Sequence, residues 1–298
     1  MQHLLLFSVS VLIWGSTWLA INFQLGVVAP EVSVFYRQAL ASLLLFAWAM
    51  LRGLNLRFSL RSHGWFFMLG FTLFGFNYVL AYNAQNYIPS AMNAVLFATM
   101  VWINVILARV FFRTPFEWHV MLGAALGMTG VVVLFWPDMT NTSLDSKTLL
   151  GAGISLAGAS VASIGNMVSH QSQKERLPVL QSNAWGMLYG AMVTGIWALI
   201  SGKTFNFEPT LEYVGSLLYL AVFGSVVAFG CYLRLLGLIG PGKAGYIAVV
   251  IPIVAVLISM VFEDLQLNLY IIAGIALVLG GNLLILAYRR LTVPKRPV

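Results

Sequence analysis

Long apolar stretches follow one another along almost the whole chain, separated by short polar segments. Each is a continuous apolar run of about 20 residues, the helix length that crosses a bilayer core of about 30 Å. A membrane β-barrel would instead show strands of about ten residues with alternating polarity. The pattern therefore predicts ten membrane-spanning helices, at residues 4–24, 31–51, 64–84, 89–111, 118–136, 149–170, 179–200, 213–233, 242–262 and 268–288.

Composition supports this interpretation. The chain is 60% hydrophobic and only 8% charged, so lipid must cover surface that a soluble protein would present as polar. The ten stretches leave no room for a soluble domain. The first stretch has no preceding basic residue and no small-residue cleavage site, so we expect a span and not a cleaved signal peptide. The predicted fold class is an all-α polytopic membrane protein.

The basic residues indicate orientation. Of the 16 Lys and Arg residues, 13 fall on the side that holds both chain ends, Lys147 and Lys203 fall on the other side, and Arg37 lies within a span. Because cytoplasmic segments are enriched in Lys and Arg, we expect both termini in the cytoplasm. The net charge of +7 is spread over short segments and forms no single basic patch, so no nucleic-acid partner is expected.

The two halves of the chain resemble each other at a shift of 151 residues. Gly130 then overlays Gly281, and the helix-breaking Pro89 corresponds to the Gly240-Pro241 pair. Five spans separate the halves, and since five is odd, the second half should be inverted relative to the first. Transporters often have such inverted repeats, with the substrate bound near the midplane between them. We predict repeats at 1–137 and 148–290 and a cytoplasmic tail at 291–298.

Small residues recur in the fifth and tenth predicted spans. Gly123 and Gly127 are four apart and Gly130 follows, while Gly274, Gly280 and Gly281 lie in the tenth span. In lipid, such residues let two helix backbones approach closely. We expect them to pack helices, either within one chain or between two, so a monomer and a homodimer both remain open.

A set of short motifs resembles a known family. They are Ile13-Trp14-Gly15-Ser16-Thr17-Trp18, Arg37, Leu122-Gly123-Ala124-Ala125-Leu126, Ile239-Gly240-Pro241-Gly242-Lys243-Ala244, Pro252 and Glu263. In order and spacing the chain resembles the EamA-type exporters of the drug/metabolite transporter superfamily. That resemblance implies cytoplasmic termini, two inverted five-helix halves around a central cavity, and export of small metabolites, often amino acids.

Polar and aromatic side chains within the spans are the candidate binding residues, because polar groups are costly in lipid and tend to face a protein interior or a cavity. Arg37 could capture a substrate carboxylate, but the family resemblance includes an arginine here whatever the substrate, which favours a structural anchor. Helical spacing puts Trp14 and Trp18 on one face and Tyr78 and Tyr82 on another. The predicted substrate-binding set is Trp14, Trp18, Arg37, Asn77, Tyr78, Tyr82, Asn93, Trp102, Asn166 and Tyr246; the predicted hinges are Pro89, Pro241 and Pro252.

No Asp or Glu falls at the middle of a predicted span, and the four histidines, His3, His63, His119 and His170, fall at or near the predicted cytoplasmic side. Proton-coupled carriers usually place a carboxylate or histidine there, so facilitated transport is the simplest mechanism. No metal site or cofactor is expected. A cavity with few charges suits a zwitterion or a weakly charged amphiphile better than a highly charged solute.

The sequence therefore favours an alternating-access exporter of amino acids or related small metabolites in a bacterial inner membrane. Its partners would be the small-molecule substrate and the lipid bilayer. A carrier for sugars, aromatic xenobiotics or other drugs is the main alternative, since tryptophans can stack on either. A membrane-embedded enzyme is less favoured because no HExxH or paired-acid motif occurs, and polar residues within the spans argue against a purely structural subunit.

Overall fold

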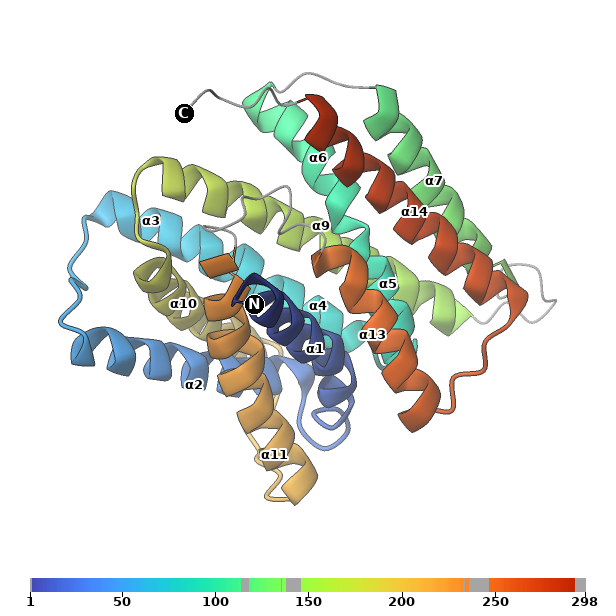
Figure 1. Ribbon diagram of the computed structural model, residues 1–298. Coiled ribbons are helices and arrows are strands. Elements are labelled where there is room, and N and C mark those ends of the chain that lie inside the picture. The colour runs from blue at the N-terminus through green and yellow to red at the C-terminus, as the bar shows by residue number, and fades with distance from the viewer. Residues whose placement is uncertain are drawn as a thin grey trace.

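The computed structural model describes residues 2–113, 118–134, 136–137, 146–232, 234–235 and 247–292, and its regular structure is helical throughout (Figure 1). This confirms the predicted all-α class. The elements are α1 (Gln2–Asn22), α2 (Pro30–Leu51), α3 (Leu60–Leu69), η1 (Gly70–Phe76), α4 (Asn77–Ala84), α5 (Ser90–Ala98), α6 (Met100–Phe112), α7 (Trp118–Leu134), α9 (Ser146–Lys174), α10 (Val179–Ile200), α11 (Leu211–Tyr219), η2 (Leu220–Val227), α13 (Ile247–Phe262) and α14 (Leu269–Thr292).

Six helical segments among the described residues are long and apolar enough to cross a membrane. Three further apolar helices are shorter, at Met121–Leu134, Ile247–Phe262 and Leu269–Leu284. These lengths agree with a multi-pass membrane protein, while the count of ten spans stays a prediction. Helix α10 is long but carries Gln181, Ser182 and Asn183 in its first turns and is not among the six.

Local sequence sets where several helices begin. Pro30 occupies the start of α2, where its missing N–H would have no intrahelical partner anyway. Ser59 caps α3 by accepting a hydrogen bond from the Ser62 N–H, and Thr210 caps α11 in the same way through the Tyr213 N–H. Residues between the apolar runs therefore define where these three helices begin.

Two predicted spans contain a wider π-helical turn in their middle. The first, η1, starts at Gly70, and the second, η2, starts at Leu220, 150 residues later. In η2 the hydroxyl of Ser225 donates to the carbonyl of Leu220, five residues earlier, at 3.1 Å. Such turns insert one residue into the helix and often lie at functional sites. Here each changes the direction in which the following side chains point.

The predicted span at 89–111 is interrupted in the structure. Helix α5 ends at Ala98 and α6 begins at Met100. At the junction the Thr99 hydroxyl donates to the Leu96 carbonyl at 2.5 Å. A threonine that bonds to its own preceding turn competes with the helical hydrogen bonds, which accounts for the break between α5 and α6. The interruption changes which faces of the two short helices align.

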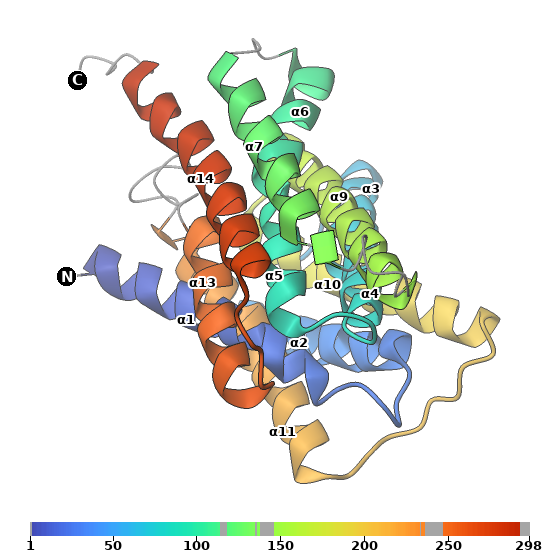
Figure 2. The same ribbon diagram turned by 90° about the vertical axis from the view of Figure 1, so that its right-hand side faces the viewer.

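Helices from the two halves of the sequence pack against each other. Helix α7 lies beside α14, α2 beside α10, and α1 beside α13 (Figures 1 and 2). The Ser42 hydroxyl of α2 donates to the Ala184 carbonyl of α10 at 2.9 Å. These cross-half pairs are the main framework around the centre of the molecule.

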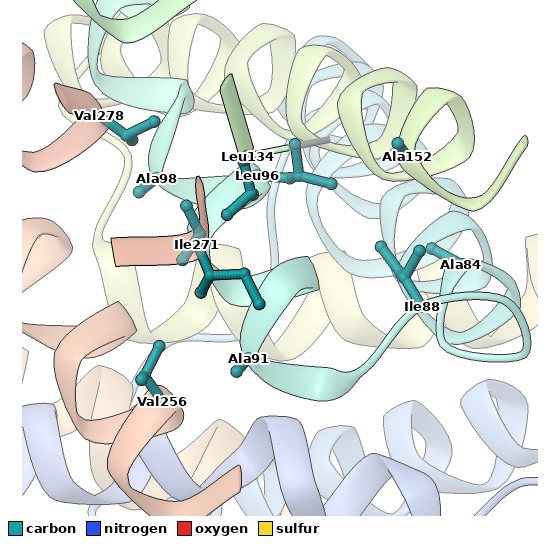
Figure 3. Close-up of a cluster of buried hydrophobic side chains, with 11 residues drawn as sticks. Ala84, Ile88, Ala91, Leu96, Ala98, Leu134, Ala152, Val256, Ile271 and Val278 are labelled. Carbon is teal, nitrogen blue, oxygen red and sulfur yellow. The ribbon is translucent and has the colours of Figure 1, made fainter. Parts of the chain in front are cut away.

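A cluster of buried aliphatic side chains joins six helices of the bundle (Figure 3). Its members come from α4, α5, α7, α9, α13 and α14 and from the short α4–α5 connection. Among them, Leu96 and Val278 are fully buried. Since lipid offers no hydrophobic drive between helices, close packing of such residues is what holds the bundle together.

The α7–α14 pair is the closest helix contact in which the predicted small residues take part. A Cβ built on Gly274 would lie 2.8 Å from the Gly130 carbonyl oxygen, and one built on Gly281 would collide with the Gly123 carbonyl. At Gly280 nothing lies within 4 Å of such a Cβ. The glycines therefore pack this pair within one chain, and Gly280, one of the small residues expected to pack helices, takes no part.

We therefore expect Gly281→Ala to destabilise the protein by about 1–3 kcal/mol, since the added methyl forces two backbones apart. Gly280→Ala is the matched control, one residue away in the same helix, and should be neutral or slightly stabilising. Thermal unfolding of the two variants in detergent checks this. Equal melting temperatures would contradict the contact.

Candidate functional site

A cavity of about 780 Å³ lies between the helices. Its walls come from α1, α4, α5, α6, α9 and α13, together with Leu73 of η1, Arg37 of α2 and the residues that follow η2. Both halves of the chain contribute. This volume is in the range that encloses a small organic molecule.

Aromatic rings form much of the cavity wall. Trp14 lies 5.2 Å from the Phe229 ring and 5.3 Å from the Tyr232 ring, measured between centroids. Its indole N–H donates to the Gly224 carbonyl at 3.0 Å, which fixes the orientation of the ring. Phe229 and Tyr232 both follow the wide turn η2, so that turn brings them to Trp14. The result is a rigid, mainly apolar surface.

Arg37 is a buried cation in the same wall, with 2% of its surface exposed. Its Nε donates to the Ser225 hydroxyl at 3.4 Å, and its Nη1 donates to the Tyr82 hydroxyl at 3.3 Å. The guanidinium also lies 4.5 Å from the centre of the Tyr78 ring, a cation–π distance. Within the described part of the chain no carboxylate pairs with it.

Among the described residues, three amide side chains reach the cavity. Asn166 of α9 donates to Asn104 of α6 at 3.3 Å. Asn77 is buried, and its Oδ1 has no hydrogen-bond partner among the described residues. All three line the cavity, so each can offer a donor or an acceptor to a bound molecule.

The cavity reaches one end of the helix bundle. Phe112 and Lys174, the last residues of α6 and α9, both line it. The Lys174 ammonium sits 4.6 Å above the Phe112 ring, and Lys174 is exposed. The cavity therefore opens where α6 and α9 end.

The opposite end is closed by polar contacts to Glu263. Asn22 at the end of α1 donates to one carboxylate oxygen, and Ser90 at the start of α5 donates to the other at 2.6 Å. Ser259 of α13 also donates to Glu263. On the cavity side of this contact the rings of Trp18 and Phe97 lie 5.0 Å apart. Three helices are thereby held together beyond the cavity.

The structure brings together part of the predicted site. The predicted residues that line the cavity are Trp14, Trp18, Arg37, Asn77, Tyr78, Asn166 and Pro252. Tyr246 and Pro241 lie outside the described residues. Pro89 immediately precedes α5 as its N-terminal cap residue, away from the cavity wall.

Three other predicted residues lie elsewhere. Tyr82 is fully buried behind Arg37, which it contacts. Asn93 donates to the Ala81 carbonyl at 2.9 Å and accepts from the Ser155 hydroxyl at 2.6 Å, so it joins α5 to two other helices. Trp102 faces Gly127 of α7, where a Cβ would lie 2.9 Å from its indole nitrogen. Position along each span indicated the depth of these residues, but helical spacing did not give the direction in which their side chains point.

Sequence reasoning did not select several residues of the site. Phe97, Phe229 and Tyr232 could not be identified from sequence, because single aromatic residues in an apolar span carry no distinctive signal. Glu263 was noted only as part of the family resemblance. Its partners Asn22 and Ser90 are 241 and 173 residues away in sequence, so no local pattern could reveal the contact.

Comparison with known proteins gives consistent results. The EamA-like transporter family matches residues 1–136 and 149–287. "Uncharacterized inner membrane transporter YedA" of Escherichia coli is 30% identical over 83% of this chain and 78% of its own length. "Uncharacterized transporter YoaV" of Bacillus subtilis is 24% identical over 91% of each chain. A solved structure, titled only "Crystal structure of protein", superposes with a TM-score of 0.68 at 18% identity, covering 97% and 98% of the two chains.

The different surroundings of Asn93 and Asn166 give a test. Asn93→Ala removes two buried hydrogen bonds and leaves the Ser155 hydroxyl unpaired, so we expect a loss of about 1–3 kcal/mol of stability. Asn166→Ala removes one long contact at the cavity surface and should leave stability nearly unchanged. Thermal unfolding in detergent compares them. An unchanged melting temperature for Asn93→Ala would contradict its cross-linking role.

Proposed function

The chain belongs to the EamA-like transporter family, and we propose that it exports amino acids or related small metabolites by alternating access. It is a multi-pass membrane transporter. The name of the relative YedA includes the inner membrane, which supports the same location here. The excess of basic residues on the side that holds both ends supports cytoplasmic termini.

The observation that carries this proposal is the shape of the cavity. It is open where α6 and α9 end and closed by Glu263 at the other end. With cytoplasmic termini, the open end would face the cytoplasm and the Glu263 end would face outward. Export then requires the Glu263 contacts to break while the residues around Phe112 and Lys174 approach one another.

Internal symmetry supports alternating access. The wide turns η1 and η2 occupy corresponding positions of the two proposed repeats, 1–137 and 148–290. The close α7–α14 pair joins the last helices of the two repeats. Rocking of one half against the other would expose the cavity to each side in turn.

Pro252 is the best placed of the three proposed hinges. It lies inside α13 and lines the cavity. A proline removes one backbone hydrogen bond and permits a bend at that point. Because Ser259 lies in the last turn of the same helix and Glu263 directly follows that helix, a bend at Pro252 would move the closing contact. Pro89 and Pro241 remain proposed hinges of the first and second halves.

Two features support a facilitative carrier for zwitterions. None of the residues found to line the cavity is an aspartate or glutamate, and the histidine found there, His170, lies one helical turn before Lys174 at the open end. Aromatic rings and scattered amides suit a molecule with an apolar body and a few polar atoms.

A carrier for sugars or aromatic xenobiotics is the second candidate. Trp14 and Trp18 in the wall could stack on either kind of ring, and the Asn104–Asn166 pair could bind hydroxyl groups. Competition by sugars but not by amino acids would favour it.

Uptake into proteoliposomes tests the leading proposal, using a panel of amino acids with and without a pH gradient. We expect saturable amino-acid uptake at a rate that does not depend on the pH gradient. In Trp14→Ala this uptake should fall at least about tenfold, the equivalent of about 1.4 kcal/mol of binding energy. Trp48→Ala is the control, since Trp48 is half exposed and contacts Arg52. Uptake of no amino acid, or equal loss in both variants, would contradict the proposal.

A further inference from the structure

We propose that Thr99 and Asn282 form the pivot about which α6 moves relative to α5 during transport. Asn282 of α14 is a positioning residue: it holds the helix open at Thr99 and is not among the residues found to line the cavity. The inference rests on the alternating access proposed above and assigns a pivot to the first half of the chain.

The pivot begins with a hydrogen bond that changes partners. In an unbroken helix the Trp102 N–H would donate to the carbonyl of Ala98, four residues earlier. Here the Trp102 N–H donates to the Thr99 carbonyl at 3.2 Å. The Ala98 carbonyl accepts instead from the side-chain amide of Asn282 at 3.0 Å, and Asn282 is fully buried. A side chain from another helix therefore replaces one helical hydrogen bond.

A second threonine, Thr194 of α10, shows why Asn282 matters. Thr194 is buried, and its hydroxyl also donates to carbonyls of its own preceding turn, at 3.0 and 3.2 Å. Yet α10 runs unbroken through this residue. A threonine bond of this kind is thus compatible with an intact helix. At Thr99 the capture of the Ala98 carbonyl by Asn282 supplies the difference and keeps the break open.

Asn282 also ties the break to the tightly packed α7–α14 pair. The preceding residue, Gly281, lies so close to α7 that an added Cβ would collide with the Gly123 carbonyl. Val278, one turn before Asn282, belongs to the same buried cluster as Ala98 (Figure 3). The pivot point is therefore held by a helix pair that is itself closely packed.

The two sides of the break belong to different ends of the cavity. Helix α5 is fixed by the bonds of Asn93 to α4 and α9, and by the bond of Ser90 to Glu263 at the closed end. Helix α6 leads to the open end, where its last residue, Phe112, lines the cavity. It has 13 residues, a length of about 20 Å. A small rotation at Thr99 therefore moves Phe112 by several ångströms while α5 stays in place.

The other proposed repeat interrupts the corresponding turn by different chemistry. At the shift of 151 residues Pro252 of α13 corresponds to Val101, in the first turn of α6. A proline has no N–H, so Pro252 leaves the carbonyl of Ala248 without its helical donor. Ala248 corresponds to Phe97, the residue before Ala98. Both halves thus release a carbonyl at nearly the same place, through a missing N–H in one and through a side-chain amide in the other.

The first test needs no substrate. Melting temperatures in detergent are compared for Asn282→Leu in the unaltered chain and in a Thr99→Val background. Without the threonine hydroxyl the helix can close, and the Trp102 N–H then serves the Ala98 carbonyl. Asn282→Leu should therefore lower the melting temperature by several degrees less in that background. Equal shifts in both backgrounds would overturn the link between the two residues.

The second test measures initial uptake of leucine, phenylalanine, threonine and glutamine into proteoliposomes. Because conformational steps limit many turnover rates, Thr99→Val should lower the maximal rate at least about fivefold and change the Kd for the same amino acid less than about twofold. Thr194→Val is the matched control, since it removes the same kind of bond from the unbroken α10, and its maximal rate should stay near that of the unaltered chain. An unchanged maximal rate in Thr99→Val would overturn the pivot.

A proline at the counterpart of Pro252 provides a rescue. Thr99→Val/Val101→Pro lacks the Val101 N–H, and proline is tolerated in the first turn of a helix, so we expect the break to reopen and the maximal rate to recover. A double variant that melts like the unaltered chain but stays slow would overturn the role of the break.

The two tests separate the pivot from the proposed function. Uptake of none of the four amino acids by the unaltered chain would contradict the proposed function and the role of the pivot in it. The melting temperatures would still decide whether Asn282 holds the helix open at Thr99.

Discussion

The carboxylate of Glu263 holds one end of this transporter closed. Donors from α1, α5 and α13 converge on it: Asn22, Ser90 and Ser259. A hydrogen bond to a charged group contributes about 1.5–3 kcal/mol, and here several share one acceptor. Removing that acceptor would leave three polar groups unpaired at once. The contact therefore behaves as a unit that is either made or broken, which is what a gate between two states requires.

The helix packing differs between the α7–α14 pair, which is tightly packed, and the helices around the cavity, which can bend. Helices α7 and α14 approach so closely at Gly130 and Gly274 that a Cβ added at either glycine would collide with the other helix. The helices that line the cavity are interrupted instead: by the wide turns η1 and η2, by the junction at Thr99, and by Pro252 inside α13. Breaks in the hydrogen-bond ladder are where a helix bends at low cost. The interruptions and the cavity therefore lie together.

Sequence alone predicted the helices well, because the length of an apolar run is a local property. The expected span 179–200 has the same bounds as α10, and 31–51 differs from α2 by one residue. The direction in which side chains point within the bundle was predicted less well. The junction at Thr99 lets Asn104 line the cavity while Asn93, on the other side of it, joins helices. The Glu263 contacts depend on residues far apart in the chain, which only the folded bundle brings together.

The central claim is that Glu263 keeps the outer end of the cavity closed, and a distance measurement across that end tests it most directly. Spin labels at exposed Asn86 and Leu267, in a Cys231→Ser background, report the separation of the α4–α5 and α13–α14 connections by pulsed electron resonance. We predict that Glu263→Gln adds a longer-distance population, while the neighbouring charge removal Asp264→Asn leaves the distribution unchanged. Identical distributions for both variants would contradict the claim.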